Sequence, residues 1–376
     1  MSKVTLGEVA CEIRESCKEK ENMPVVALEH LVPEEVRLTN WSTSGDNTFS
    51  KAFHKGQVLF GRRRAYLKKA ALAPFDGICS GDITVIEAKP DRLAPELLPF
   101  IIQNDAFFDF AVGKSAGSLS PRVKWEHLKN FEFSLPPLAQ QRKLAQVLWS
   151  MDALKQAYRR LMDKTDELVK SQFVEMFGDV VSNNKHWPMK QFDTITSSRL
   201  GKMLDGKRQT GLHKYPYLAN CNVQWFHFEL NDLKEMDFNE EEQVEFELED
   251  GDLMVCEGGE IGRCAVWHNS IQPCYYQKAI HRVRCDFRLV LPDYLAWWFK
   301  LNCEQNSFES IAGAKATIAH LPGEKLKKLM VMLPPVELQH QFVTLISQLD
   351  KSKFALQKSL DELRALSSKL VKEHLG

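Results

Sequence analysis

Two stretches of the chain carry apolar residues at alternating spacings of four and three, which is the heptad pattern of coiled-coil helices. Each stretch follows a Leu-Pro-Pro triplet, at 135–137 and again at 333–335. Proline suits the first turn of a helix because its missing N–H has no partner there. The pattern therefore predicts two helices of about 40 residues, over 137–180 and 335–376, each about 60 Å long.

The two helical stretches repeat each other in register, because Gln141 corresponds to Gln339 and Asp152 to Asp350. A lone helix of this length would expose its apolar stripe, so we expect each copy to pack on the other. The first helix leads away from the first domain and the second leads back, so the pair should be antiparallel. The residues predicted to pair the helices are Val147, Met151, Leu154, Leu161 and Leu168 in the first helix and Leu345, Leu349, Leu356, Leu363 and Leu366 in the second.

Shorter runs with strand character precede each helix, and they also correspond. GQVLFG (56–61) has the place of GDLMVC (251–256), and VTLGEV (4–9) that of KQFDTI (190–195). Such runs, broken by Gly, Pro and Asn and followed by a helical stretch, predict small α+β domains. We therefore predict an α+β fold with two similar domains, at 1–136 and 181–334, separated by two long antiparallel coiled-coil helices and related by a pseudo-two-fold internal repeat.

The overall composition excludes some classes of protein without choosing a function. The 376 residues carry a formal net charge of −1, so any affinity for nucleic acid would have to come from local basic patches. No apolar stretch approaches the roughly 18 residues of a membrane span, and the N-terminal segment lacks the pattern of a signal peptide. None of the nine cysteines lies in a CxxC pair. We therefore expect a cytoplasmic protein with reduced thiols.

Three segments carry a resemblance to a known family. They are KGQVLFGRRRAYLKKAALAPFDGICSGD (55–82), SAGSLSPRVKWEHLKNFEFSLPPLAQQRKLAQVL (115–148) and its weaker second copy GAKATIAHLPGEKLKKLMVMLPPVELQHQFVTLI (313–346). With the duplicated order of domain, Leu-Pro-Pro and long helix, the chain resembles the specificity subunit of type I restriction-modification systems over essentially its whole length. The second copy departs from the pattern, since Leu338 replaces Gln140 and Leu321-Pro322-Gly323 replaces the Arg-Val-Lys run.

The resemblance implies a subunit without a catalytic centre that reads double-stranded DNA. Each domain would be a target-recognition domain that reads one half of a split, asymmetric target. Two methyltransferase (M) subunits and restriction/translocase (R) subunits would assemble on the chain. S-adenosylmethionine, ATP and Mg would then belong to those partners. The sequence agrees, since it has no GxxxxGK[ST] phosphate loop, no Asn-Pro-Pro-Tyr-type tetrapeptide and no glycine fingerprint after a strand.

The strongest local feature is a basic run without acidic residues between 55 and 69. Lysine and arginine can neutralise backbone phosphates, and arginine can also read guanine in the major groove. The alternative is a solvated strand face, on which the three consecutive arginines would point to alternating sides. The residues expected to contact DNA here are Arg62, Arg63, Arg64, Tyr66, Lys68 and Lys69, with Lys55 beside them.

Further DNA contacts are expected from loops in which glycine and short polar side chains suit insertion into a groove. The alternative for each is an ordinary connecting loop. In the first domain the residues are Lys114, Ser115, Ser118 and Arg122. In the second domain they are Lys202, Lys207, Arg208, Gln277, Lys278, His281, Arg282, Lys315, Thr317 and His320. The acidic segment 229–252 should face away from DNA and act as a solvated face.

Two other functions remain open at the level of sequence. Asp76, Glu87 and Lys89 follow the order that metal-dependent nucleases use, which allows a DNA endonuclease as an alternative. A coiled-coil scaffold without DNA function is the other alternative, because a heptad pattern alone says no more than that. A metal site built from Cys256, Cys264, Cys274 and His281 is disfavoured by its wide and irregular spacing.

Overall fold

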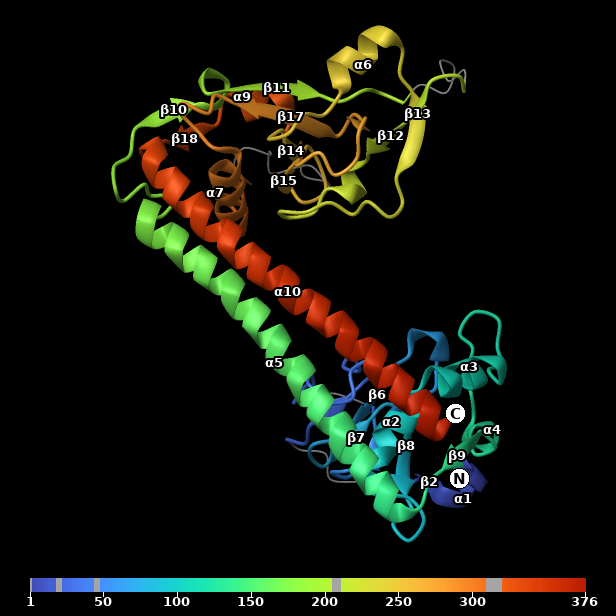
Figure 1. The fold of residues 1–376 in the computed structure, drawn as a ribbon. Helices are drawn as coiled ribbons and strands as arrows, with labels where there is room; N and C mark the ends of the chain where they lie inside the picture. The colour runs from blue at the N-terminus through green and yellow to red at the C-terminus, as the bar shows by residue number, and fades with distance from the viewer. Residues whose placement is uncertain (1, 18–21, 44–47, 205–210, 309–319) are drawn as a thin grey trace. The chain divides into compact units, whose positions relative to one another are not determined.

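The structure is a computed structural model that describes residues 2–17, 22–43, 48–204, 211–308 and 320–376. It consists of two compact units, Met1–Met162 with Ala355–Gly376, and Asp163–Phe354. Each unit combines one α+β domain with part of both long helices (Figure 1). Within the described residues, no helix is both long enough and apolar enough to cross a membrane.

The first unit is built around three small sheets. Its central sheet is antiparallel, and the middle strands β5 and β8 are buried except at Glu87 because the sheet is covered on both faces. The strand orders are β2 (Ala10–Ile13), β8 (Ile83–Ala88), β5 (Val58–Gly61), β6 (Ala70–Leu72) in the central sheet; β3 (Val25–Val26), β7 (Gly77–Cys79), β4 (Lys51–Phe53) in the second; and β1 (Ser2–Thr5) with β9 (Glu132–Leu135) in the third.

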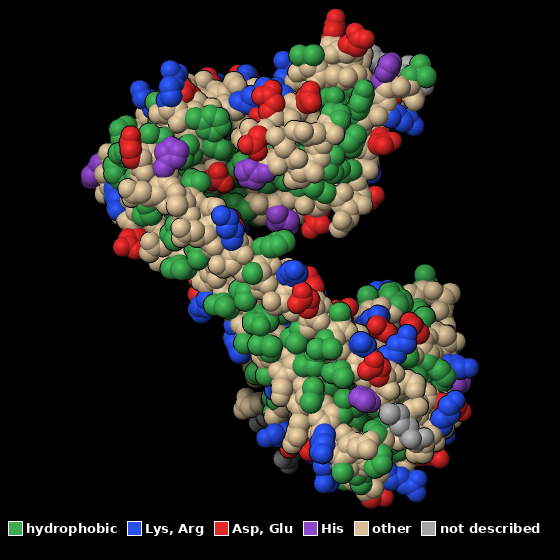
Figure 2. All heavy atoms as spheres, in the orientation of Figure 1, with side chains coloured by type: hydrophobic (Ala, Val, Ile, Leu, Met, Phe, Trp, Pro, Cys, Tyr) green, Lys and Arg blue, Asp and Glu red, His purple; other side chains and the backbone are tan. Residues whose placement is uncertain are grey.

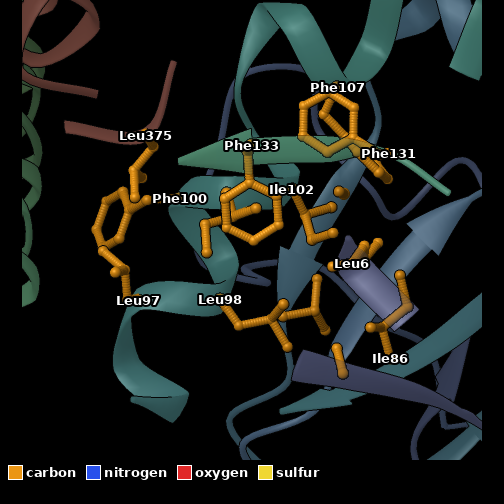
Figure 3. Packing of buried hydrophobic residues seen from close by; sticks show 14 of the residues in the cluster. Leu6, Ile86, Leu97, Leu98, Phe100, Ile102, Phe107, Phe131, Phe133 and Leu375 are labelled. Atoms are coloured by element: carbon orange, nitrogen blue, oxygen red, sulfur yellow. The ribbon is translucent and has the colours of Figure 1, made fainter. Parts of the chain in front are cut away.

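Short helices close the core of the first unit. They are α1 (Leu6–Val9), η1 (Ala65–Leu67), η2 (Pro95–Leu97), α2 (Leu98–Ile102), α3 (Asp105–Gly113) and α4 (Trp125–Leu128). Figure 3 shows Leu375, near the end of the chain, beside Leu97 and Phe100 in this core. The core of the first domain is therefore completed by the C-terminal end of the chain.

The second unit repeats this plan with different lengths. Its sheets are β11 (Thr196–Leu200), β17 (Ile280–Cys285), β14 (Leu253–Cys256), β15 (Cys264–Val266); then β13 (Lys234–Asp237), β12 (Lys214–Leu218), β16 (Tyr275–Tyr276); and β10 (Met189–Gln191) with β18 (Met330–Met332). Its shorter helices are η3 (Phe192–Thr194), η5 (Asn220–Asn222), α6 (Glu240–Phe246), α7 (Pro292–Glu304) and α9 (Gly323–Lys327).

The predicted internal repeat is confirmed by the sheets. The order β2-β8-β5-β6 in the first unit matches β11-β17-β14-β15 in the second. GQVLFG and GDLMVC both supply the strand between the hairpin partner and the long strand, as β5 and β14. The second sheets differ in one strand: β4 pairs with β7, whereas β13 pairs with β12. The repeat thus preserves the main sheet and varies at the edge.

The long helices are α5 (Leu138–Phe177) and α10 (Val336–Leu375), of 40 residues each. In the first unit Leu148, near the start of α5, shares a core with Val371 and Leu375 at the end of α10. In the second unit Phe177, at the end of α5, packs edge to face on Phe342 near the start of α10, with ring centroids 5.3 Å apart. Opposite ends meet in each unit, so the predicted antiparallel pairing is confirmed.

A buried glutamine fixes the start of each long helix to its domain. The Gln141 amide accepts from Ala94 N at 2.8 Å and donates to the carbonyls of Arg92 and Pro136. Gln339 accepts from Leu291 N at 2.9 Å and donates to the carbonyls of Leu289 and Pro334. The two side chains are 1% and 0% exposed, and each satisfies two buried backbone groups and a third that is partly buried.

The residues predicted to pair the helices are buried to different degrees, and their pairing stays a prediction. Val147, Leu154, Leu161, Leu168 and Leu366 are between 41% and 52% exposed. Met151, Leu345, Leu349, Leu356 and Leu363 are partly buried. The reason is that each helix packs on its own domain as well as on its partner, which moves the buried line away from the heptad positions. In the second half of α5 this line runs through Val169, Phe173 and Phe177.

Candidate nucleic-acid interface

The three consecutive arginines of the first domain do not lie on a strand. Strand β5 ends at Gly61, and only Arg63 continues the ladder, through an isolated antiparallel bridge to Arg122. Arg64 adopts a left-handed conformation with φ of 53°, which turns the chain into η1. The alternation expected for a strand was therefore wrong. Arg62, Arg63 and Arg64 form a turn at the end of the central sheet, which we call the arginine turn.

The carboxylate of Asp82 pairs with Arg122 and with one of the three consecutive arginines, Arg63. Arg122 donates to both carboxylate oxygens of Asp82, at 2.7 and 3.1 Å. Arg63 Nη1 lies 3.7 Å from the same carboxylate. The hydrogen bonds from Arg122 hold the pKa of Asp82 below its ordinary value. Sequence reasoning missed Asp82 as a partner, because the contact joins residues 40 positions apart that no local pattern connects.

The loop 115–122 is held against the arginine turn by backbone and side-chain hydrogen bonds. Ala116 and Arg122 exchange two backbone hydrogen bonds, of 3.0 and 2.9 Å, and Arg64 N donates to Pro121 O at 2.8 Å. Arg63 Nη2 donates to Ser120 Oγ at 3.0 Å. The structure therefore brings Arg63, Arg64 and Arg122 together at one loop, and Ser118 lies exposed on it.

Other predicted residues of the first domain already have partners within it. Lys69 Nζ donates to Leu28 O at 2.8 Å, and Lys68 Nζ contacts Asp105 at 2.5 Å, which raises the pKa of Lys68. Lys114 lies over the ring of Phe110, 5.8 Å from its centroid. Tyr66 is 55% exposed. The lysines thus stabilise the domain, and their contact with DNA stays a prediction.

Two predicted contacts of the second domain lie in its interior. His281 is 2% exposed, and its Nε2 lies 3.2 Å from Leu321 O. Burial lowers the pKa of this imidazole, so the ring is neutral at pH 7. The Lys202 side chain is 11% exposed, and its ammonium donates to Asp237 O at 2.6 Å and contacts Glu242 at 2.5 Å. His281 was therefore wrongly predicted to reach DNA, because it faces the core from the central strand β17.

Part of the acidic segment of the second domain lies against these cations, and its orientation relative to DNA stays a prediction. Helix α6 provides the carboxylates that pair with Lys202 and Arg199. Arg282 Nη1 donates to the carbonyls of Glu245 and Glu247 at 3.0 and 2.9 Å. The pairing of β11 with β17 sets Arg199 beside Arg282, and α6 supplies the acidic partner of Arg199.

These contacts leave fewer of the predicted residues of the second domain free to contact DNA. Lys278 is exposed and Gln277 is partly exposed, beside the bridge from Gln277 to Lys202. His320 is exposed and bridges to Gly258. Lys207, Arg208, Lys315 and Thr317 lie outside the described residues.

The residues of the alternative nuclease site have separate structural partners. Asp76 accepts from Lys55 N at 2.7 Å, Glu87 accepts from Gln57 Nε2 at 3.1 Å, and Lys89 Nζ donates to Gly7 O at 2.7 Å. Among the residues that the structure describes, no group of three or more His, Cys, Asp or Glu side chains could hold a metal ion.

The cysteines of the disfavoured metal site are buried thiols. Burial raises the pKa of Cys256 to about 11 and that of Cys274 to about 12, and it raises that of Cys264 as well.

Charge on the surface is mixed. Figure 2 shows Lys and Arg side chains among Asp and Glu side chains on the face drawn. This agrees with the formal net charge of −1. Any binding of anions would therefore depend on local groups of cations, such as Arg64 and Arg122.

Two copies of one α+β domain, each joined to a long helix by the same buried glutamine, define a duplicated protein with paired helices. The chain belongs to the family of the type I restriction modification DNA specificity domain, whose family model matches residues 2–161 and again 184–363.

The chain is similar to two curated proteins of Escherichia coli. It is 25% identical over 160 residues to the type I restriction enzyme EcoDI specificity subunit, a match that covers 39% of this chain and 35% of the relative. It is 22% identical over 279 residues to the EcoKI specificity subunit of strain K12, which covers 70% of this chain and 60% of the relative. The matches thus span about a third and three fifths of these relatives' lengths.

Solved structures show the same fold along the whole chain. The type I restriction-modification system S subunit from M. genitalium aligns with a TM-score of 0.59 at 14% identity, covering 100% of this chain and 96% of that one. A chain from a structure concerned with complex assembly and conformational transition of the type I R-M system aligns with a TM-score of 0.55 at 16% identity, covering 99% and 97%.

Proposed function

We propose that this chain is the non-catalytic specificity subunit of a type I restriction-modification complex and reads a bipartite, asymmetric DNA target. The observation that carries the proposal is the duplicated domain with an altered surface. The main sheets match in strand order, while the turn after β5 carries Arg62, Arg63 and Arg64 and the corresponding turn after β14 carries Glu257 and Glu260. Two similar domains with different surfaces suit two different half-sites.

The proposal assigns the chemistry to partners. Two M subunits and the R subunits supply adenine methylation and DNA translocation or cleavage, and S-adenosylmethionine, ATP and Mg belong to them. The absence from the sequence of a phosphate loop and of an Asn-Pro-Pro-Tyr-type tetrapeptide supports this division. The exposed apolar residues Val147 and Leu154 of α5 support a protein partner along this helix.

Methylation mapping tests the proposal. Cells that carry this chain with its M subunit should methylate adenines in two fixed half-sites separated by a spacer of unspecified sequence. Deletion of this chain should abolish the modification. Methylation at a single continuous motif, or methylation that persists without this chain, would contradict the proposal.

Purified protein separates the two alternatives. A specificity subunit should bind duplex DNA with an affinity that falls steeply as salt rises. A scaffold without DNA function would show no such binding. A nuclease would cleave DNA with magnesium alone.

A further inference from the structure

One apolar side chain on the loop beside the arginine turn is almost fully exposed. Leu119 is 89% exposed, the largest exposed fraction among the large hydrophobic side chains that the structure describes. Single exposed leucines are common on protein surfaces. Leu119 differs because it lies near the tip of the loop 115–122, next to Ser118 and Ser120.

The loop holds this leucine in a defined position. The two arms are joined by the paired hydrogen bonds between Ala116 and Arg122, and Gly117 makes the turn with φ of +116°. On the C-terminal side of Leu119, Ser120 accepts from Arg63 and Pro121 accepts from Arg64. A backbone held in this way loses little conformational freedom on binding, so a contact of Leu119 contributes more to affinity.

Cations next to the loop indicate an anionic partner. Arg64 is exposed, and the Arg122 side chain is 45% exposed although it is paired with Asp82. An apolar protein surface would have to desolvate these guanidinium groups without compensation, whereas DNA offers a phosphate for each. The occupant must therefore combine phosphates with a small apolar group.

The paired arms select the groove. Two chain segments joined by a bridge, as at Ala116 and Arg122, fit the major groove of B-DNA, about 12 Å wide, and not the minor groove, about 6 Å wide. On the base edges of the major groove, the methyl group at C5 of thymine is the apolar contact. We propose that Leu119 determines specificity by packing on the C5 methyl group of one thymine in the half-site read by the first domain. This inference rests on the proposed function.

The test combines a change in the protein with a change in the DNA. Full-length chain with its M subunit is titrated with duplexes in which each thymine of both mapped half-sites is replaced, one at a time, by deoxyuridine. For the unmodified protein, one replacement should weaken binding about fourfold, the loss expected for one buried methyl group. Leu119→Ala should bind thymine DNA several-fold more weakly and should be indifferent to that same replacement.

A control variant and three outcomes decide the matter. Val244→Ala removes a side chain that is 85% exposed on α6, and it should keep the sensitivity to deoxyuridine. The inference is overturned if the unmodified protein tolerates deoxyuridine at every thymine, or if Leu119→Ala stays as sensitive as the unmodified protein. A protein that binds no half-site specifically would overturn the proposed function as well, which distinguishes the two failures.

Discussion

At the scale of single residues, the arginines at and beside the arginine turn differ in whether they are paired with a carboxylate. Arg122 and Arg63 share the carboxylate of Asp82, so part of their charge is neutralised within the domain. Arg64 is exposed at the same turn. An exposed arginine can bind a phosphate without breaking an ion pair. A paired arginine is held by its carboxylate partner in one orientation.

Replacement of Arg64 tests this assignment. Arg64→Gln should weaken DNA binding several-fold and should reduce the slope of log affinity against log salt by about 1, the effect of one phosphate contact. Binding titrations at graded salt measure both quantities. Arg160→Gln, at an exposed arginine of α5, should leave the slope unchanged. An equal change in both variants would rule out a specific role for Arg64.

The pair of Asp82 with Arg122 should make the stability of the first unit depend on pH. Because Arg122 lowers the folded-state pKa of Asp82, the pair stabilises the fold above the ordinary carboxyl pKa of 3.8, and this contribution is lost as pH falls through the lowered pKa. Asp82→Asn should therefore lower the melting temperature at pH 7 and have a smaller effect below pH 3.8. Thermal unfolding followed by circular dichroism at both pH values checks the sign, which a constant difference would contradict.

At the scale of elements, the glutamine at the start of each long helix sets the direction in which the helix leaves its domain. Gln141→Met keeps the volume but leaves the buried Ala94 N–H and two carbonyls without a partner. We expect a loss of about 3 kcal/mol in unfolding free energy, since each unsatisfied buried group costs about 1–3 kcal/mol. Denaturant titration measures it. Gln140→Met, at the exposed neighbouring position, should change the stability little, and equal losses would show that the hydrogen bonds are not the cause.

The exposed apolar residues of α5 yield a prediction about assembly. Val147 and Leu154 are 48% and 41% exposed, one heptad apart on the same face. Val147→Lys with Leu154→Lys should weaken binding of the M subunit at least tenfold while the melting temperature stays within a few degrees. Ala153→Lys, at an exposed position on another face, serves as the control in calorimetric titration. Unchanged affinity in the double variant would place the M subunit elsewhere.

At the scale of the whole molecule, the duplication means that α5 could replace α10. In the first unit α10 contributes Val371 and Leu375 to the core beside Leu148. A fragment of residues 1–180 lacks α10 and exposes that face, so we expect it to form a symmetric dimer in which each α5 covers the other. Sedimentation should show a dimer, and methylation mapping should show a palindromic target. A monomer at high concentration would mean that α5 cannot take the place of α10.

Local signals in the sequence were enough to predict the long helices and the repeat. The heptad spacing, the Leu-Pro-Pro triplets and the correspondence of Gln141 with Gln339 are short-range patterns, and the structure has helices of 40 residues with the same glutamine contact at each start. The exact pairing residues were less predictable. Leu168 and Val169 are neighbouring apolar residues. Val169 is buried and Leu168 is not, and only the position of the domain decides this.

The sequence by itself determined the duplicated order of domain and helix and the presence of a basic run. Both depend only on the type and spacing of residues that are close together in the chain. The tertiary structure alone decided which of those charges are paired. Asp82 reaches Arg122, and Glu242 reaches Lys202, each across 40 positions of sequence. His281 belongs to the core because β17 lies between β11 and β14. Charge pairing and burial are properties of distant segments brought together by the sheets, so no local pattern could specify them.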